Sequence, residues 1–228
     1  MVKDDRSYTK QLVDNIMELP NAAIILNEVS IKLEEERKKR AKFYNDITEQ
    51  EKAEFINGEI IIHSPVKMEH NDATGSLYKL ISVFNDKNKL GYVGYEKIMI
   101  SLTRNDYEPD ICFFDKSKSV KFKKGQSLFP APDLIVEVLS KSTTKNDRGI
   151  KFEDYQAHQV LEYWIIDPLK SMVEQYRLNT KGTYELILKA KKGTLESKAI
   201  KGFTIPIESI FDENINLETL EKILNTSA

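Results

Sequence analysis

Residues 134–139 read Leu-Ile-Val-Glu-Val-Leu, an apolar run that is interrupted only by the carboxylate of Glu137. A short run of this kind, rich in branched residues and apolar on both faces, is typical of a strand in the centre of a sheet. An ionised carboxylate in such a strand is costly to bury unless something compensates its charge. Glu137 therefore indicates either a structural ion pair with a lysine or arginine, or a metal site.

A second carboxylate, Asp110, follows Pro109 at the start of another apolar stretch, and we expect a strand over residues 108–114. Two carboxylates on adjacent strands would form an oxygen site that suits Mg²⁺. Asp110 alone is a weaker signal, because Pro-Asp is common in turns. Together the two acids predict a site whose cofactor is Mg²⁺ or Mn²⁺.

Basic residues follow the Glu137 strand at Lys141, Lys145, Arg148 and Lys151. We expect a helix over residues 146–158, and such a helix can fold back over the end of the strand and place one lysine beside the acids. Tyr155 lies four residues after Lys151, so the two side chains share a helix face. Any one of these lysines, taken alone, is equally compatible with a solvated surface charge.

The surrounding pattern mixes helices and strands. Asn57-Gly58 is a turn pair that suits a tight hairpin over residues 55–62. Apolar periodicity predicts helices over residues 8–18, 21–42, 68–86 and 217–224, and strands over residues 91–102, 162–166, 172–178, 184–188 and 194–197. This order predicts an α/β (α+β) fold with a mixed central β-sheet flanked by helices.

The composition of the chain argues against several classes of protein. The chain has 228 residues, a formal net charge of −2 and one cysteine, Cys112. These values argue against a disulfide scaffold, a thiolate metal site and a protein that coats nucleic acid through bulk charge. There is no apolar run near the ~20 residues that span a bilayer, and no apolar signal core, so we expect a cytoplasmic protein without a membrane partner. We expect Cys112 and Trp164 in the core.

An ordered set of segments identifies a resemblance to a known family. Together these segments resemble the Uma2 family (DUF820) of restriction-endonuclease-like proteins, a branch of the PD-(D/E)XK nuclease superfamily, over roughly residues 52–212. The segments are Glu54-Phe55-Ile56-Asn57-Gly58-Glu59-Ile60, Glu69-His70, Glu108-Pro109-Asp110, and residues 132–143, 147–155 and 160–168.

The resemblance implies a restriction-endonuclease-like core and assigns roles to residues. Asp110 and Glu137 match the two acids of the superfamily, and the backbone carbonyl of Val138 would complete a metal shell. The superfamily lysine usually stands two residues after the second acid, where this chain has Leu139, and Lys151 on the following helix takes its place. Further candidates for the site are Glu54, Glu69, His70 and Tyr155, and candidates for nucleic-acid contact are Lys141, Lys145 and Arg148.

The function implied by the resemblance is that of a Mg²⁺-dependent endonuclease, a hydrolase of phosphodiester bonds in nucleic acid, for which we expect DNA. The alternative is a non-catalytic nucleic-acid-binding or regulatory protein that keeps the fold. We expect residues 1–51 to form a helical extension, residues 52–212 the nuclease-like domain and residues 213–228 a helical tail. The extension would serve packing or homodimer formation.

Overall fold

The computed structural model describes residues 5–48 and 51–226. The chain divides into two compact units. The first takes in the chain up to His63 together with Thr103–Tyr107, and the second comprises Ser64–Leu102 and the chain from Glu108 onward. The segment boundaries expected from the sequence, at residues 52 and 213, stay predictions.

The first unit combines two helices with a small antiparallel sheet. Its elements are α1 (Asp5–Met17), α2 (Ala22–Asp46), β1 (Ala53–Ile56), β2 (Glu59–Ile62) and β5 (Asp106–Tyr107). β1 pairs with β2 and with β5. The turn between β1 and β2 confirms the predicted hairpin, because Asn57 and Gly58 both have positive φ angles, 52° and 82°.

One arginine ties the C-terminal part of α2 to β5. The Arg40 guanidinium donates from Nε and Nη2 to the two carboxylate oxygens of Asp106, at 2.6 and 2.7 Å. The Tyr44 hydroxyl donates to the same carboxylate at 2.7 Å. Asp106 is fully buried, so this bidentate pair compensates a charge that would otherwise be costly.

The second unit is built on a six-stranded mixed sheet in the order β11-β10-β9-β8-β6-β3. Only β8 and β9 run parallel to each other, and the other neighbours are antiparallel. The strands are β3 (Gly91–Tyr95), β6 (Ile111–Asp115), β8 (Leu134–Val138), β9 (Glu162–Asp167), β10 (Met172–Leu178) and β11 (Tyr184–Ala190). Smaller pairs are β4 (Met99–Ser101) with β7 (Leu128–Phe129), and β12 (Thr194–Glu196) with β13 (Thr204–Pro206).

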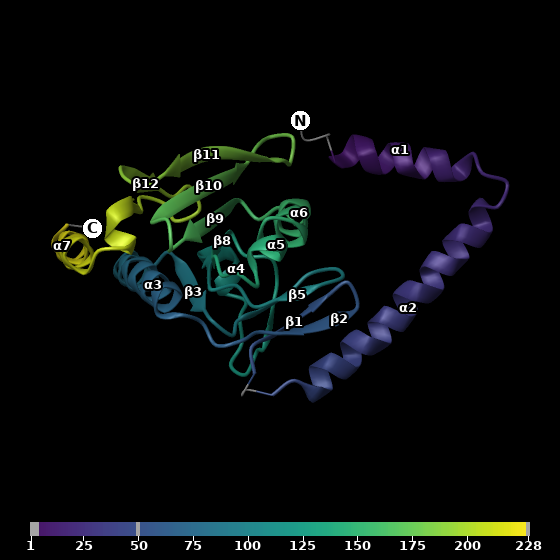
Figure 1. Cartoon of the computed structure of the whole chain (residues 1–228), viewed down its shortest axis with the longest axis horizontal. Helices are drawn as coiled ribbons and strands as arrows, with labels where there is room; N and C mark the ends of the chain where they lie inside the picture. The colour runs from purple at the N-terminus through teal and green to yellow at the C-terminus, as the bar shows by residue number, and fades with distance from the viewer. Residues whose placement is uncertain (1–4, 49–50, 227–228) are drawn as a thin grey trace. The chain divides into compact units, whose positions relative to one another are not determined.

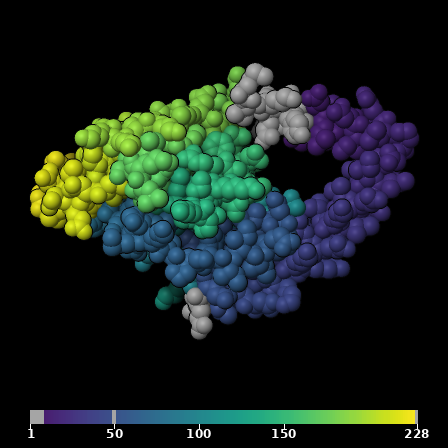
Figure 2. All heavy atoms as spheres, viewed as in Figure 1, coloured from purple at the N-terminus to yellow at the C-terminus, as the bar shows by residue number. Residues whose placement is uncertain are grey.

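One face of this sheet carries the main core. It is covered by α3 (Met68–Asn88), the 3₁₀ turn η1 (Ile207–Ile210) and α7 (Glu213–Asn225), with Leu77, Leu80 and Ile81 of α3 fully buried (Figure 1). The atoms of α7 and α3 meet without a gap (Figure 2). Trp164 and Cys112 are fully buried, which confirms both as core residues.

The other face carries the connection between the two parallel strands. Parallel neighbours need a crossover, and here α5 (Thr144–Asp147) and α6 (Ile150–Ala157) supply it between β8 and β9. The predicted single helix over residues 146–158 is therefore wrong in detail, because the chain breaks at Arg148 and Gly149. A Cβ at Gly149 would lie 2.8 Å from the Lys145 carbonyl oxygen, so the break needs glycine.

Other differences from the expected elements are local. The predicted strand over residues 91–102 is two strands, β3 and β4, because Glu96 adopts a left-handed φ of 59° and ends β3. Lys116–Ser119 form a short helix, α4. Within the part of the chain that the structure describes, we find no helix with the length and apolarity to cross a bilayer.

Candidate active site

Asp110 and Glu137 lie opposite each other on neighbouring strands. β6 and β8 are antiparallel with Ile111 paired to Val136, and continuing that register by one residue sets Asp110 opposite Glu137. Directly opposed side chains on an antiparallel pair have their Cβ atoms roughly 5 Å apart. The Asp110 carboxylate accepts a hydrogen bond from the Val138 N–H at 2.8 Å, which fixes it at this end of the sheet. Both acids are buried.

Lys151 reaches Glu137 from the crossover. Its Nζ donates to Oε1 of Glu137 at 3.0 Å, and only 2% of its side chain is exposed. A lysine is rarely buried to this extent without paired charge. The second helix of the crossover, α6, lies against the sheet and carries this lysine to the acid.

Tyr155 meets the same carboxylate oxygen. Its hydroxyl donates to Oε1 of Glu137 at 2.9 Å, and the whole residue is buried. Lys151 and Tyr155 are four residues apart, so a shared helix face brings both donors to one acceptor. The structure thus brings together Glu137, Lys151 and Tyr155 as one hydrogen-bonded group.

Asp147 extends this group, although the sequence analysis assigned it no role. Its Oδ1 lies 3.4 Å from the Lys151 Nζ, and the side chain is buried. The Tyr163 hydroxyl donates to the Asp147 carbonyl oxygen at 2.9 Å. Burial, and then the charges of Glu137 and Asp147, raise the pKa of Tyr163 well above its ordinary value, so it remains a donor. The four-residue spacing of Asp147 and Lys151 was the available signal.

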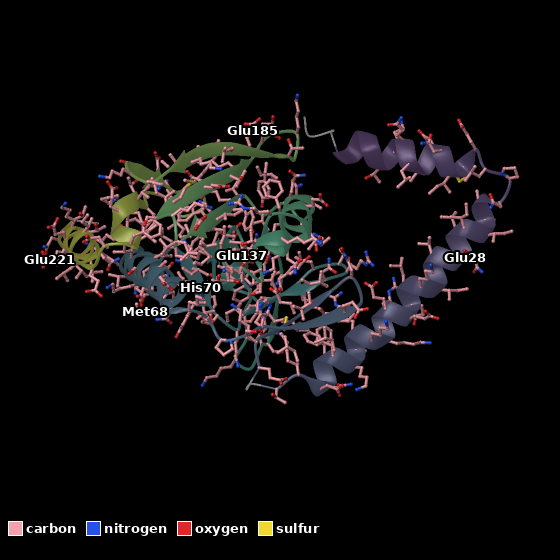
Figure 3. The ribbon with its side chains drawn as sticks, in the orientation of Figure 1. Glu28, Met68, His70, Glu137, Glu185 and Glu221 are labelled. Atoms are coloured by element: carbon pink, nitrogen blue, oxygen red, sulfur yellow. The ribbon has the colours of Figure 1, made fainter. Side chains whose placement is uncertain are left out.

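His70 approaches the site from the opposite helix. Its Nε2 lies 3.2 Å from Oδ2 of Asp110, and the residue is buried in the first turn of α3. Figure 3 labels His70 and Glu137, which come from α3 and from the central strand β8. Glu69, the neighbour of His70, is exposed. His70 is thus the residue of the Glu69-His70 pair that contacts Asp110.

The remaining candidates have other surroundings. Glu54 belongs to the first compact unit, where its Oε2 lies 3.1 Å from Nε2 of His63.

Lys141 and Lys145 are exposed on the loop and helix after β8. Arg148 donates from Nη1 and Nη2 to the two carboxylate oxygens of Glu174, at 2.7 and 3.0 Å. That hydrogen bond is the main cause that lowers the pKa of Glu174 to about 2. Nucleic-acid contact by these three basic residues stays a prediction.

The donor set at the acid pair suits a hard divalent cation. Mg²⁺ prefers oxygen ligands, keeps several waters and is usually held by one or two carboxylates. Asp110 and Glu137 offer two carboxylates on adjacent strands. Over residues 5–48 and 51–226 no group of three or more His, Cys, Asp and Glu side chains is arranged to hold a metal ion. A cation here would therefore complete its shell with water or with a carbonyl such as that of Val138.

Two relatives are similar to this chain in sequence. The chain is 32% identical over 130 residues to an uncharacterized protein of Synechocystis sp., covering 56% of this chain and 72% of that protein. It is 26% identical over 165 residues to a second uncharacterized Synechocystis protein, covering 72% of this chain and 85% of that protein.

A solved structure has a similar fold. The crystal structure of "a putative nuclease belonging to DUF820" from Anabaena variabilis matches with a TM-score of 0.64 at 17% identity, covering 78% of this chain and 96% of that chain. At this identity the likeness shows the fold alone.

The family model described as "Uma2: Putative restriction endonuclease" matches residues 40–208, a span that includes Asp110, Glu137 and Lys151. Because this match covers well over half of the sequence, the chain belongs to the Uma2 family.

Proposed function

We propose that this protein is a metal-dependent endonuclease that hydrolyses phosphodiester bonds, with DNA as its substrate and Mg²⁺ or Mn²⁺ as its cofactor. The observation that carries the proposal is the buried contact of 3.0 Å between the Lys151 Nζ and the Glu137 carboxylate, beside Asp110 on the adjacent strand. Membership of the Uma2 family and the nuclease-like fold support it.

Each residue has a defined part in this proposal. Asp110 and Glu137 would hold the cation, with the Val138 carbonyl as a further ligand. When bound, the cation supplies charge that polarises the phosphate and lowers the pKa of a water molecule. The Lys151 ammonium would orient the attacking water and stabilise negative charge on the phosphate as the water oxygen bonds to phosphorus and the P–O ester bond breaks. The water gives up a proton to solvent and the leaving oxygen takes one up, so the step consumes one water molecule.

The neighbouring donors keep this arrangement in place. Tyr155 and Lys151 both donate to Oε1 of Glu137, which fixes the orientation of that carboxylate. The Val138 N–H donates to the Asp110 carboxylate, and Nε2 of His70 lies 3.2 Å from the same oxygen. Preorganised groups of this kind need no rearrangement at the moment of reaction. Lys141, Lys145 and Arg148 would contact the phosphate backbone outside the buried site. Glu54 and Glu69 stay candidates for further contacts.

The test is cleavage of labelled DNA, with and without Mg²⁺ or Mn²⁺, by the wild type and by Asp110→Asn, Glu137→Gln and Lys151→Met. Glu221→Gln is the matched control, because Glu221 is an exposed acid on α7 (Figure 3). We expect metal-dependent cleavage by the wild type and the control, and a loss of at least ~100-fold in the three site variants. Cleavage that persists in Glu137→Gln would show that this site does not carry the activity, and binding of DNA without cleavage by the wild type would favour the non-catalytic alternative. Homodimer formation and a cytoplasmic location stay predictions.

A further inference from the structure

Two tyrosine rings contact each other in a tilted arrangement at the end of β3, where Tyr95 pairs with the residue that follows Asp110. The ring centroids of Tyr78 on α3 and Tyr95 on β3 are 4.1 Å apart, with 31° between the ring planes. Tyr95 is 50% exposed although it is a large aromatic residue. An exposed tyrosine presents a flat apolar face with a polar rim, the kind of surface on which a planar ring can stack.

The pairing of β3 with β6 places Tyr95 close to Asp110. Tyr95 pairs in register with Ile111, the residue that follows Asp110. The next residue, Glu96, donates its backbone N–H to the Asp110 carbonyl oxygen at 3.0 Å and has the left-handed φ of 59°. A non-glycine residue in this conformation is held there by its surroundings, and such positions cluster at functional sites. Tyr95 faces α3 together with its partner Ile111, and the same helix carries His70 to within 3.2 Å of Asp110, so α3 links the tyrosine pair to this acid.

The helix beside the pair has an unusual glycine. Gly75 lies in the interior of the 21-residue helix α3, and a Cβ built there meets no atom within 4 Å. Packing therefore does not require glycine, and glycine weakens a helix interior by roughly 1 kcal/mol relative to alanine. Gly75 is one turn before Tyr78, so the two share a face. The missing side chain leaves room for a ligand beside the tyrosines.

Two lysines flank the tyrosine pair, beside the acids Asp72 and Glu96. Lys79 follows Tyr78 and Lys97 lies two residues after Tyr95, and both are exposed. Aromatic side chains flanked by basic residues are the common surface for single-stranded nucleic acid, in which bases stack on the rings while the cations meet the backbone.

We propose that Gly75, Tyr78 and Tyr95 form a base-stacking site that takes an unpaired nucleobase next to the scissile phosphate. The proposal rests on the proposed nuclease function and adds the state of the substrate, which is single-stranded or locally unpaired at the site. A base inside an intact duplex is already stacked on both sides and cannot cover the tyrosine face.

The test is the affinity of the full chain for fluorescent DNA in the presence of EDTA, which prevents cleavage. The probes are a single strand, a blunt duplex and the same duplex with one bulged base. The variants are Tyr95→Leu and Gly75→Gln, with Tyr92→Leu as the matched control. Tyr92 is a 40% exposed tyrosine on the same strand, whose ring packs against Phe114, Phe122 and Phe129 instead.

The expected result is tighter binding of the single strand and the bulged duplex than of the blunt duplex. Tyr95→Leu and Gly75→Gln should each weaken binding of the single strand by roughly tenfold, within the range measured for one stacked base. Tyr92→Leu should change it by less than about twofold. Gly75→Gln also serves as a folding check, because replacing a helix-interior glycine should keep or raise the melting temperature.

Two outcomes overturn the inference in different ways. If the wild type binds and cuts DNA while Tyr95→Leu and Gly75→Gln keep full affinity, the tyrosine pair has only a structural role and the proposed function stands. If the wild type binds none of the three probes, the stacking site fails, and the proposed function fails with it only if DNA is also not cleaved in the presence of Mg²⁺ or Mn²⁺. A loss of stability in Tyr95→Leu without a loss of affinity counts as the first outcome.

Discussion

The Lys151 ammonium lies 3.0 Å from Oε1 of Glu137, although 14 residues separate the two in the sequence and both side chains are buried. Three features produce this contact. β8 carries Glu137 in the centre of the sheet, the crossover to the parallel strand β9 must return over that sheet, and a break at Gly149 sets the direction of α6. The same contact contributes to the stability of the fold and to the proposed chemistry. Measuring both the free energy of unfolding and the cleavage rate of each variant separates these two contributions.

Lys151→Met leaves the buried Glu137 without its ammonium partner. Breaking a buried ion pair from one side typically costs about 3–5 kcal/mol. We expect a loss of that order in the free energy of unfolding, measured by urea titration with the buried Trp164 as the fluorescent probe. Lys170→Met, at an exposed pair with Asp167, should cost less than about 1 kcal/mol. The double variant Lys151→Met with Glu137→Gln should recover part of the loss. Equal stability of the Lys151 and Lys170 variants would show that the contact is not formed.

Tyr155→Phe removes one donor from the Glu137 carboxylate and keeps the ring. A hydrogen bond to a charged group contributes about 1.5–3 kcal/mol, so we expect a loss of stability in this range and a fall in cleavage rate. Tyr176→Phe is the matched control, because the Tyr176 hydroxyl donates to Glu174 at 2.8 Å, away from the acid pair. Both variants should be destabilised, but only Tyr155→Phe should slow metal-dependent cleavage. A normal rate in Tyr155→Phe would mean that the hydroxyl does not position Glu137.

The pair of Glu174 and Arg148 predicts a dependence of stability on pH. The hydrogen bond from Arg148 is the main cause that lowers the pKa of Glu174 from 4.5 to about 2. Because the folded-state pKa lies below the unfolded value, this carboxylate stabilises the fold fully above pH ~4.5, and the contribution is lost as the pH falls toward 2. Glu174→Gln should therefore cost more stability at neutral pH than near pH 3. A cost that does not change with pH would contradict this assignment, and Glu221→Gln should show little cost at either pH.

Much of the sheet could be predicted from the sequence because its signals are local. The Asn57-Gly58 turn, the apolar run of β8 and the periodicity of α3 each follow from short stretches, and all are confirmed. The breaks at Glu96 and Gly149 could not be predicted in this way. Glu96 takes its left-handed conformation within a hydrogen bond to Asp110, and Gly149 is required by the approach of the Lys145 carbonyl. Both depend on contacts formed only in the folded chain.

In the candidate site, too, some features follow from local sequence signals and others depend on contacts in the folded chain. The shared face of Lys151 and Tyr155 follows from their spacing, and the structure directs both donors to Glu137. Asp147 has the same spacing from Lys151, but this spacing, the one signal for it in the sequence, does not distinguish a buried acid from an exposed one. Its burial and the bond from Tyr163 to its carbonyl arise from the packing of the crossover on β9. The pair of Tyr78 and Tyr95 likewise joins two distant elements.

Arg40→Met tests how α2 is held within the first unit. The Asp106 carboxylate, fully buried, would lose both bonds from the guanidinium, and we expect a cost of about 3–5 kcal/mol. Faster hydrogen exchange of the β1–β2 hairpin, measured by mass spectrometry, should accompany it. Arg37→Met is the control, because its ion pair with Glu34 is exposed. Unchanged exchange in Arg40→Met would show that the hairpin does not depend on this pair.

Calorimetric titration of Mn²⁺ into the wild type and into Glu137→Ala tests the central claim most directly, because it measures cation binding without a substrate. Glu221→Ala controls for loss of an acid elsewhere on the chain. The account predicts saturable binding to the wild type and to Glu221→Ala, and none to Glu137→Ala. A wild type that does not bind Mn²⁺, or a Glu137→Ala variant that binds it as well as the wild type, would contradict the proposed metal-dependent site.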